Sequence, residues 1–559
     1  MLRLSASSRW RSVKLFEGWT VLVGAIALPL SLPLLVVIGS VLTPTYAIWS
    51  HLASTVLGDY ILNSLGLMIG VGCGVVGIGV STAWLVTACR FPGSRLLEWL
   101  LLLPLAAPAY ILAYVYTEML EYYGPVQSLL RAAFGWRSVA DYWFPDVRSL
   151  EGAVVMLTLV LYPYVYLLAR VAFLEQSVCT LEASRSLGCT PWQSFLKVAL
   201  PLARPAIAAG TALALMEALS DFGTVEFFGV STFTTGIYRT WFGMGDRVAA
   251  SQLAACLMGF VLILLAVERW FRQRAKYYQV SNRQQLLPYS LRGSRAAIAQ
   301  AVCILPPLLG FLIPAGYLVS LTLSNWSKTF SKQFWSDAGH SLVLAGITAA
   351  VGVVIGLIMA YGVRLRPSWG MTAGVRLAAM GYAIPGSVIA VGILIPLGRF
   401  DNALDAWLKS IAGISTGLLL SGTIFALVFA YLVRFLAVSL GTVESSLGQI
   451  KPSLDEAAAS LGYRPAKTLL QVHAPLMSSG LLTAVLLVFV EVMKELPATL
   501  IVRPFDFDTL AVRVYRLAAD ERLAEAAAPA LAIVLAGIIP VVLLSRQIRQ
   551  SRLSARSEF

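Results

Sequence analysis

Residues 182–188 read EASRSLG, and residues 456–462 read EAAASLG. In each copy a valine and then a proline follow the glycine at the same spacing, as Val198 and Pro201 and again as Val472 and Pro475. Both stretches are polar islands in a chain that is otherwise almost continuously apolar. A motif that recurs in this way predicts a duplicated architecture, with one copy in each half of the chain.

The composition around the islands is that of a membrane protein. The chain has 559 residues, of which 58% are hydrophobic and 13% charged, whereas soluble domains have about 25% charged residues. About 12 apolar runs approach the roughly 20 residues that a spanning helix needs, although the third, fifth and ninth are interrupted by proline or polar residues. They begin near Trp19, Ile61, Leu96, Gly152, Ala203, Val248, Ala297, His340, Thr372, Gly417, Met477 and Glu525. The first run, residues 21–42, is too long for a signal-peptide core and is interpreted as a retained helix. The sequence therefore predicts an all-α polytopic membrane protein.

The repeat extends beyond the islands. Glu217 and Asp221 precede Glu491 and Glu495 by the interval that separates the two islands. Two six-span halves are therefore predicted, and they share one orientation because each has an even number of spans. The predicted divisions are the N-terminus with a leading helix (1–56), the first half (57–270), a basic linker (271–296), the leading helix of the second half (297–336), the second half (337–546) and a tail (547–559).

The formal net charge of +13 is unevenly distributed. If both islands are cytoplasmic and the chain alternates through its spans, most of the 42 Lys and Arg residues fall on the cytoplasmic side. This positive-inside pattern predicts that both termini and the linker are cytoplasmic, and it explains the charge without a nucleic-acid partner. The six cysteines form no CxxC pair, which indicates small buried residues rather than disulfides or zinc ligands.

Each island has the pattern of a helix–turn–helix. Gly188 and Gly462 stand where a helix would end, a position at which glycine adopts a positive φ freely. Thr190 and Gln193 then have the spacing of a capping box, and Pro465 restarts a helix in the second copy. The sequence thus predicts two short, rigid elbows.

This pattern resembles the loop of ATP-binding-cassette importer permeases that reads Glu-Ala-Ala, three residues, Gly, nine residues, Ile-x-Leu-Pro. The departures are small: Ser184 for the second Ala, Val198 and Val472 for Ile, and Ala474 for Leu. The resemblance implies the type I (MetI-like) importer permease fold, in which this loop docks on a separate ATPase subunit. It implies a coupling role for Glu182, Ala183, Gly188, Pro201, Glu456, Ala457, Gly462 and Pro475, and two copies of the ATPase.

The chain lacks the sequence of an ATPase of its own. A Walker A loop needs Gly-Lys followed by Ser or Thr, and no lysine here follows a glycine. No nucleophile, metal or phosphate constellation supports an enzyme either. The chain is therefore expected not to be an enzyme and to bind no cofactor of its own.

Five ionisable residues fall in two of the predicted spans. Glu217 and Asp221 lie one helical turn apart, and Glu491, Lys494 and Glu495 likewise share one helix face. A charge at the bilayer centre costs about 2.5–3.5 kcal/mol, so these side chains must face protein or water, or lie near the end of a span. Two interpretations stay open: the residues line a translocation path or gate, or Lys494 and a neighbouring carboxylate form an ion-paired lock.

Four stretches resemble the fused ferric-iron importer permeases, namely residues 221–229 (DFGTVEFFG), 232–242 (TFTTGIYRTWF), 492–500 (VMKELPATL) and 503–505 (RPF). The resemblance covers essentially the whole chain. It implies a bacterial inner-membrane permease that receives Fe(III) from a periplasmic ferric-binding protein. Hard Fe(III) prefers oxygen ligands, so the carboxylates are compatible with this cargo, but no clustered ligand set is visible and no metal site is assigned.

Two alternatives stay open. Fused permeases for thiamine or phosphonate share the same layout. A two-half secondary transporter could instead be driven by protons through Glu217 and Glu491, although the paired loops argue against it. Uptake without any ATPase subunit would favour the secondary transporter.

Overall fold

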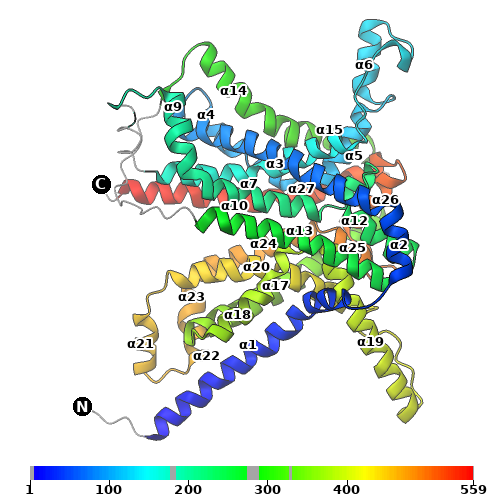
Figure 1. Ribbon diagram of the computed structural model, residues 1–559. Helices are drawn as coiled ribbons and strands as arrows, with labels where there is room; N and C mark the ends of the chain where they lie inside the picture. The colour runs from blue at the N-terminus through cyan, green and yellow to red at the C-terminus, as the bar shows by residue number, and fades with distance from the viewer. Residues whose placement is uncertain (1–5, 177–183, 185, 274–288, 327–329, 558–559) are drawn as a thin grey trace. The chain divides into compact units, whose positions relative to one another are not determined.

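The computed structural model describes residues 6–176, 184, 186–273, 289–326 and 330–557. Within these residues the structure is almost entirely helical (Figure 1). The exceptions are β1 (Cys89–Arg90) and β2 (Tyr289–Ser290), which form one short parallel pair. The predicted all-α fold is confirmed.

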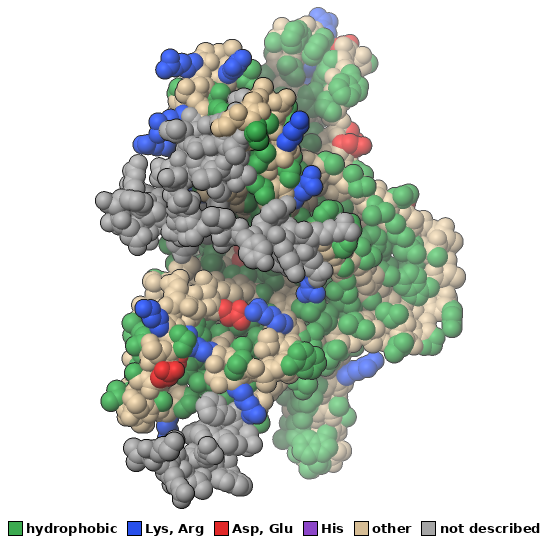
Figure 2. Space-filling view, turned by 60° about the vertical axis from the view of Figure 1, so that its left-hand side comes forward, with side chains coloured by type: hydrophobic (Ala, Val, Ile, Leu, Met, Phe, Trp, Pro, Cys, Tyr) green, Lys and Arg blue, Asp and Glu red, His purple; other side chains and the backbone are tan. Residues whose placement is uncertain are grey.

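Ten helices in the described part of the chain are long and apolar enough to cross a membrane, and two bent helix pairs raise the number to as many as 12. The bent pairs are Ser94–Ala106 with Ala109–Phe134, at 93°, and Pro465–Leu476 with Ser478–Met493, at 82°. Their number matches the twelve predicted runs, but the ninth run was predicted to begin near Thr372, and the span found there begins only at Gly386, after two short helical segments at Trp369–Ala378 and Ala379–Ala383. The first bend falls at Pro108, because proline pushes the preceding residue out of helical geometry. Hydrophobic side chains cover much of the face seen in Figure 2, as lipid contact requires.

The described helices fall into two compact units. Unit A comprises residues 1–45, 240–255 and 335–512. It contains α1 (Ala6–Ser40), α17 (Lys332–Leu365), α18 (Trp369–Ala378), η6 (Ala379–Ala383), α19 (Gly386–Ala412), α20 (Ile424–Gly448), α21 (Ser453–Ser460), α22 (Pro465–Thr468), η7 (Leu469–His473), α23 (Ala474–Leu476), α24 (Ser478–Met493) and α25 (Pro497–Val502).

Unit B comprises residues 46–239, 256–334 and 513–559. It contains α2 (Tyr46–Thr55), α3 (Leu57–Ala88), α4 (Ser94–Leu100), η1 (Leu103–Ala106), α5 (Ala109–Leu120), α6 (Pro125–Phe134), η2 (Val139–Asp141), α7 (Leu150–Glu175), α9 (Pro191–Ser194), η3 (Phe195–Ala199), α10 (Leu200–Ser220), α11 (Gly223–Phe227), α12 (Phe233–Tyr238), α14 (Ser294–Pro307), η5 (Leu308–Leu312), α15 (Ile313–Ser324) and α27 (Leu523–Ser557). Three elements, η4 (Arg239–Gly243), α13 (Arg247–Gln273) and α26 (Leu510–Ala519), are divided between the two units.

The leading helices are exchanged between the sequence halves. In unit A, α1 packs against α18, α19 and α20, which come from the second half of the sequence (Figure 1). In unit B, α14, η5 and α15 pack against helices of the first half, including α3, α5 and α7, and α27 packs against η1 and α15. The predicted domain boundaries stay a prediction. The compact units differ from the two sequence halves, because each unit contains a leading helix from the other half.

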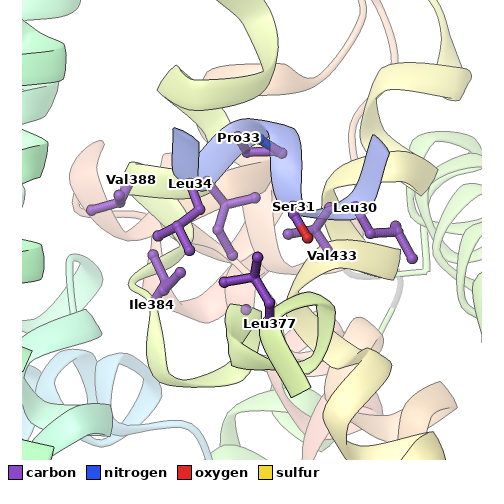
Figure 3. A pocket seen from close by; sticks show the side chains of 10 residues that line it. Leu30, Ser31, Pro33, Leu34, Leu377, Ile384, Val388 and Val433 are labelled. Carbon is purple, nitrogen blue, oxygen red and sulfur yellow. The ribbon is translucent and has the colours of Figure 1, made fainter. Parts of the chain in front are cut away.

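A close backbone approach fits α1 against α19. A Cβ atom at Gly392 would lie 2.5 Å from the carbonyl oxygen of Pro33, so only glycine fits there. The seam beside this contact encloses an apolar pocket (Figure 3). It is lined by Leu30, Ser31, Pro33, Leu34, Leu377, Gly381, Ile384, Val388, Ile389 and Val433. Its one hydroxyl, on Ser31, donates to Ala27 O within α1 (2.8 Å) and leaves the lining apolar.

In each unit an ion pair joins a short helix, α4 after α3 or α18 after α17, to a long helix. The short helix carries the acidic residue in one unit and the basic residue in the other. In unit B, Glu98 on α4 pairs with Arg170 on α7, whose side chain is 2% exposed. In unit A, Arg376 on α18 pairs with Glu444 on α20 at 3.3 Å. Arg170 and Glu444 occupy equivalent positions in the repeat. The repeat has kept the attraction between these helices while exchanging the charges.

Candidate functional site

The first loop, residues 182–201, turns at Gly188. Its φ of +83° lies in the left-handed region, as predicted for a helix stop. Thr190 N–H donates to Gln193 Oε1 (3.0 Å) and Gln193 N–H donates to Thr190 Oγ1 (3.3 Å). The predicted capping box is therefore confirmed, and it begins α9. Glu182 and Ala183, which were predicted to couple to an ATPase, lie outside the described residues.

The second loop, residues 453–475, repeats this arrangement. α21 ends before Gly462, whose φ is +76°, and α22 begins at Pro465 as predicted. Glu456 and Ala457 are exposed on α21. Each glycine also follows an exposed leucine, Leu187 at 84% in the first loop and Leu461 at 76% in the second. Both loops thus present a turn flanked by accessible side chains.

The two prolines of the motif produce a π-helical turn in each loop. Leu200 N–H donates to Phe195 O at the end of η3, and Ala474 N–H donates to Leu469 O at the end of η7. Pro201 and Pro475 follow directly. A proline inside a helix has no N–H to donate and its ring clashes with the carbonyl four residues earlier, so the preceding turn widens. This accounts for prolines at both equivalent positions.

An ionic network that the sequence analysis missed anchors the second loop within unit A. Arg364, at the end of α17, donates from Nε (3.0 Å) and Nη2 (2.6 Å) to Asp455 Oδ2 on α21. It also donates to the carbonyls of Leu447 (2.6 Å) and Ile450 (2.9 Å), where α20 ends. The other carboxylate oxygen, Oδ1 of Asp455, accepts from Nε2 of the fully buried His473 at 2.6 Å. The one signal in the sequence was an acidic residue directly before the Glu-Ala-Ala motif.

The predicted membrane carboxylates are not all alike. Asp221 follows α10, and its carboxylate accepts from the N–H groups of Thr224 (3.0 Å) and Val225 (3.1 Å). Glu495 follows α24 and accepts from the N–H groups of Ala498 (2.9 Å) and Thr499 (3.0 Å). Each side chain therefore caps a short helix, α11 or α25, by satisfying N–H groups that have no partner within the helix.

The expectation that these charges share one continuous helix face is wrong at the helix ends. α10 ends at Ser220 and α24 at Met493, so Asp221, Lys494 and Glu495 lie beyond them. The chain leaves helical geometry there because each carboxylate turns to cap the following short helix instead of continuing the span.

The remaining ionisable residues are half-buried. Lys494 Nζ lies 2.9 Å from Glu491 Oε1, so Glu491 is the carboxylate that pairs with Lys494. Glu217 on α10 is half-buried too. Arg434 Nη1 approaches Glu495 Oε1 at 3.6 Å within unit A. Among the residues that the structure describes, no group of three or more His, Cys, Asp or Glu side chains could hold a metal ion.

The paired turns and spans define a class of membrane transport protein. The chain matches the family described as binding-protein-dependent transport system inner membrane component over residues 74–277 and again over residues 352–552. These two segments cover more than half of the chain, so it belongs to this family. It is a multi-pass inner-membrane transport component.

Several transport permeases are similar to this chain over different shares of its length. It is 26% identical to an Fe(3+)-transport system permease protein of Haemophilus influenzae over 94% of this chain and 97% of that protein. A ferric transport system permease protein of Actinobacillus pleuropneumoniae is 25% identical over 78% of this chain and 64% of its own length. A molybdenum transport system permease protein of Escherichia coli is 29% identical over 35% of this chain and 87% of its own length. A segment shorter than half of this chain thus matches nearly all of that smaller permease.

Proposed function

We propose that this chain is the permease subunit of an ATP-driven importer for Fe(III), delivered from outside by a periplasmic ferric-binding protein. The observation that carries the proposal is the duplicated turn at Gly188 and Gly462 in a chain that matches the transport family twice. The cargo is inferred from a relative named as an Fe(3+)-transport permease that matches nearly the whole chain, and from two ferric permeases that match about three quarters of it.

The two loops are the proposed docking sites for two ATPase subunits on the cytoplasmic face, with both chain termini on that side. The coupling residues are Glu182, Ala183, Gly188, Pro201, Glu456, Ala457, Gly462 and Pro475. Physical support comes from the geometry that the described parts of both loops share: the glycine turns the chain with a positive φ, and a π-helical turn before each proline sets the direction of the returning chain.

The membrane carboxylates divide into two proposed roles. Asp221 and Glu495 hold α11 and α25 in place as part of a gate, because their oxygens are already used by backbone N–H groups. Glu217, Glu491 and Lys494 are half-buried and line the translocation path. The Glu491–Lys494 pair keeps the local charge close to neutral, which lowers the barrier for a cation to leave.

Uptake in proteoliposomes tests the proposal. The permease, co-purified with its ATPase subunits, is expected to accumulate radioactive iron only with ATP inside and with iron-loaded binding protein outside. Uptake of thiamine and of phosphonate is measured in parallel. ATP-dependent uptake of one of these in place of iron would leave the mechanism intact and change only the cargo. Iron accumulation by the permease without ATPase subunits would refute the proposal and favour a proton-coupled carrier.

A further inference from the structure

The carboxylate of Asp455 connects more elements of unit A than any residue of the predicted motif. Its Oδ2 receives two hydrogen bonds from Arg364 on α17, and its Oδ1 receives one from His473 on η7. Asp455 itself lies on α21, before the turn, and His473 lies after it. One side chain therefore joins both limbs of the second loop to the end of a long membrane helix.

Arg364 extends this connection to α20. The last carbonyls of a helix have no partner within it and carry partial negative charge, so a guanidinium there is stabilising. Arg364 donates to the carbonyl of Leu447, in the last turn of α20, and to that of Ile450, just beyond it, with donors that Asp455 leaves available. Because the side chains of Arg364 and Asp455 are only 18% and 28% exposed, solvent screens their attraction incompletely.

We propose that Asp455 is a positioning residue for energy coupling: it makes the second loop, α17 and the end of α20 move as one body when the ATPase pushes on the loop. This rests on the proposed function, in which the loop is the ATPase docking site. Charge-assisted hydrogen bonds are about twice as strong as neutral ones, so such a link transmits displacement where loose packing would slip.

The first loop lacks the aspartate and the histidine of this contact. The positions equivalent to Asp455 and His473 are Leu181 and Ala199, neither of which carries an ionisable group. Among the described residues of the first loop, two neutral hydroxyls are in contact, Ser184 Oγ and Ser194 Oγ at 2.8 Å.

The returning helices differ as well. The first continues without a break over Trp192–Ser220, whereas the second bends by 82° between Leu476 and Ser478. In the proposed mechanism the ionic anchor compensates for this bend, because a bent helix transmits a push less directly than a continuous one. The two loops are therefore not equivalent, and the second depends on ion pairing.

The test uses the full permease with its ATPase subunits in proteoliposomes and measures iron uptake and ATP hydrolysis together. Asp455→Asn keeps the shape of the side chain and removes its charge. We expect uptake per ATP hydrolysed to fall about tenfold, as loss of hydrogen bonds to a charged group implies. Affinity for the ATPase subunits should be unchanged, and the protein should remain folded at the assay temperature. Arg364→Lys, which keeps the charge with fewer donors, should give an intermediate ratio.

Glu444→Gln is the matched control, because it weakens an ion pair of α20 that does not touch the loop, and its ratio should match the wild type.

The outcomes are distinguishable. An unchanged ratio in Asp455→Asn, with uptake still abolished by Gly462→Val, overturns the positioning role and leaves the proposed function intact. A parallel loss of ATPase affinity, thermal stability and uptake shows a merely structural contact and also overturns it. If neither variant changes uptake, the loop is not a coupling element and the proposed function itself fails.

Discussion

Replacing Gly462 by larger residues tests the second turn in a graded way. Its φ of +76° is accessible to glycine, tolerated by asparagine and strongly disfavoured for a β-branched residue. A Cβ atom at this position would meet no other atom within 4 Å, so the effect is confined to the backbone. Gly462→Val should raise the free energy of the native turn by about 2 kcal/mol, which reduces its population relative to other conformations about 30-fold.

The assay is ATP-dependent iron uptake, with binding of the ATPase subunits measured on the same samples. Gly462→Asn should retain most uptake, Gly462→Ala should lose part, and Gly462→Val should lose nearly all, while membrane insertion is unchanged in all three. Gly398→Val is a control on α19, where glycine is also unobstructed but has helical geometry. Equal uptake in the Asn and Val variants would refute the reasoning, because backbone conformation would then not decide coupling.

Three further predictions concern the membrane helices and the loop that contains Asp141. Glu98→Arg should destabilise unit B by about 3–5 kcal/mol by leaving Arg170 beside a like charge, and adding Arg170→Glu should restore most of the thermal midpoint. Asp221→Ala should destabilise α11 by about 1–2 kcal/mol and increase hydrogen exchange of its first amides, since two N–H groups lose their acceptor. Hydrogen bonds from the backbone N–H groups of Arg137 and Ser138 hold the pKa of the Asp141 carboxyl below its ordinary 3.8. Because the folded pKa is the lower one, the turn they form should persist at neutral pH and be lost only as pH falls through that lowered pKa, which amide exchange between pH 5 and pH 2 would detect.

Much of the architecture was predictable because its signals are local. Each span is a continuous apolar run, and each turn is set by a glycine and a proline a few residues apart, as at Gly188 and Pro201. The carboxylates Asp221 and Glu495 were also found, because a charge in an apolar run is conspicuous. Their role as helix caps was not, since it depends on where α10 and α24 end.

The sequence by itself determined the membrane class, the duplication and the two elbows, because these are encoded within short stretches. Only the tertiary structure decided that α1 packs on helices of the second half and that Asp455 joins Arg364 to His473. Hydropathy shows that a helix face is apolar but not which apolar neighbour it meets. That choice depends on shape, such as the approach of Pro33 to Gly392, and on pairing between charges that are distant in the chain.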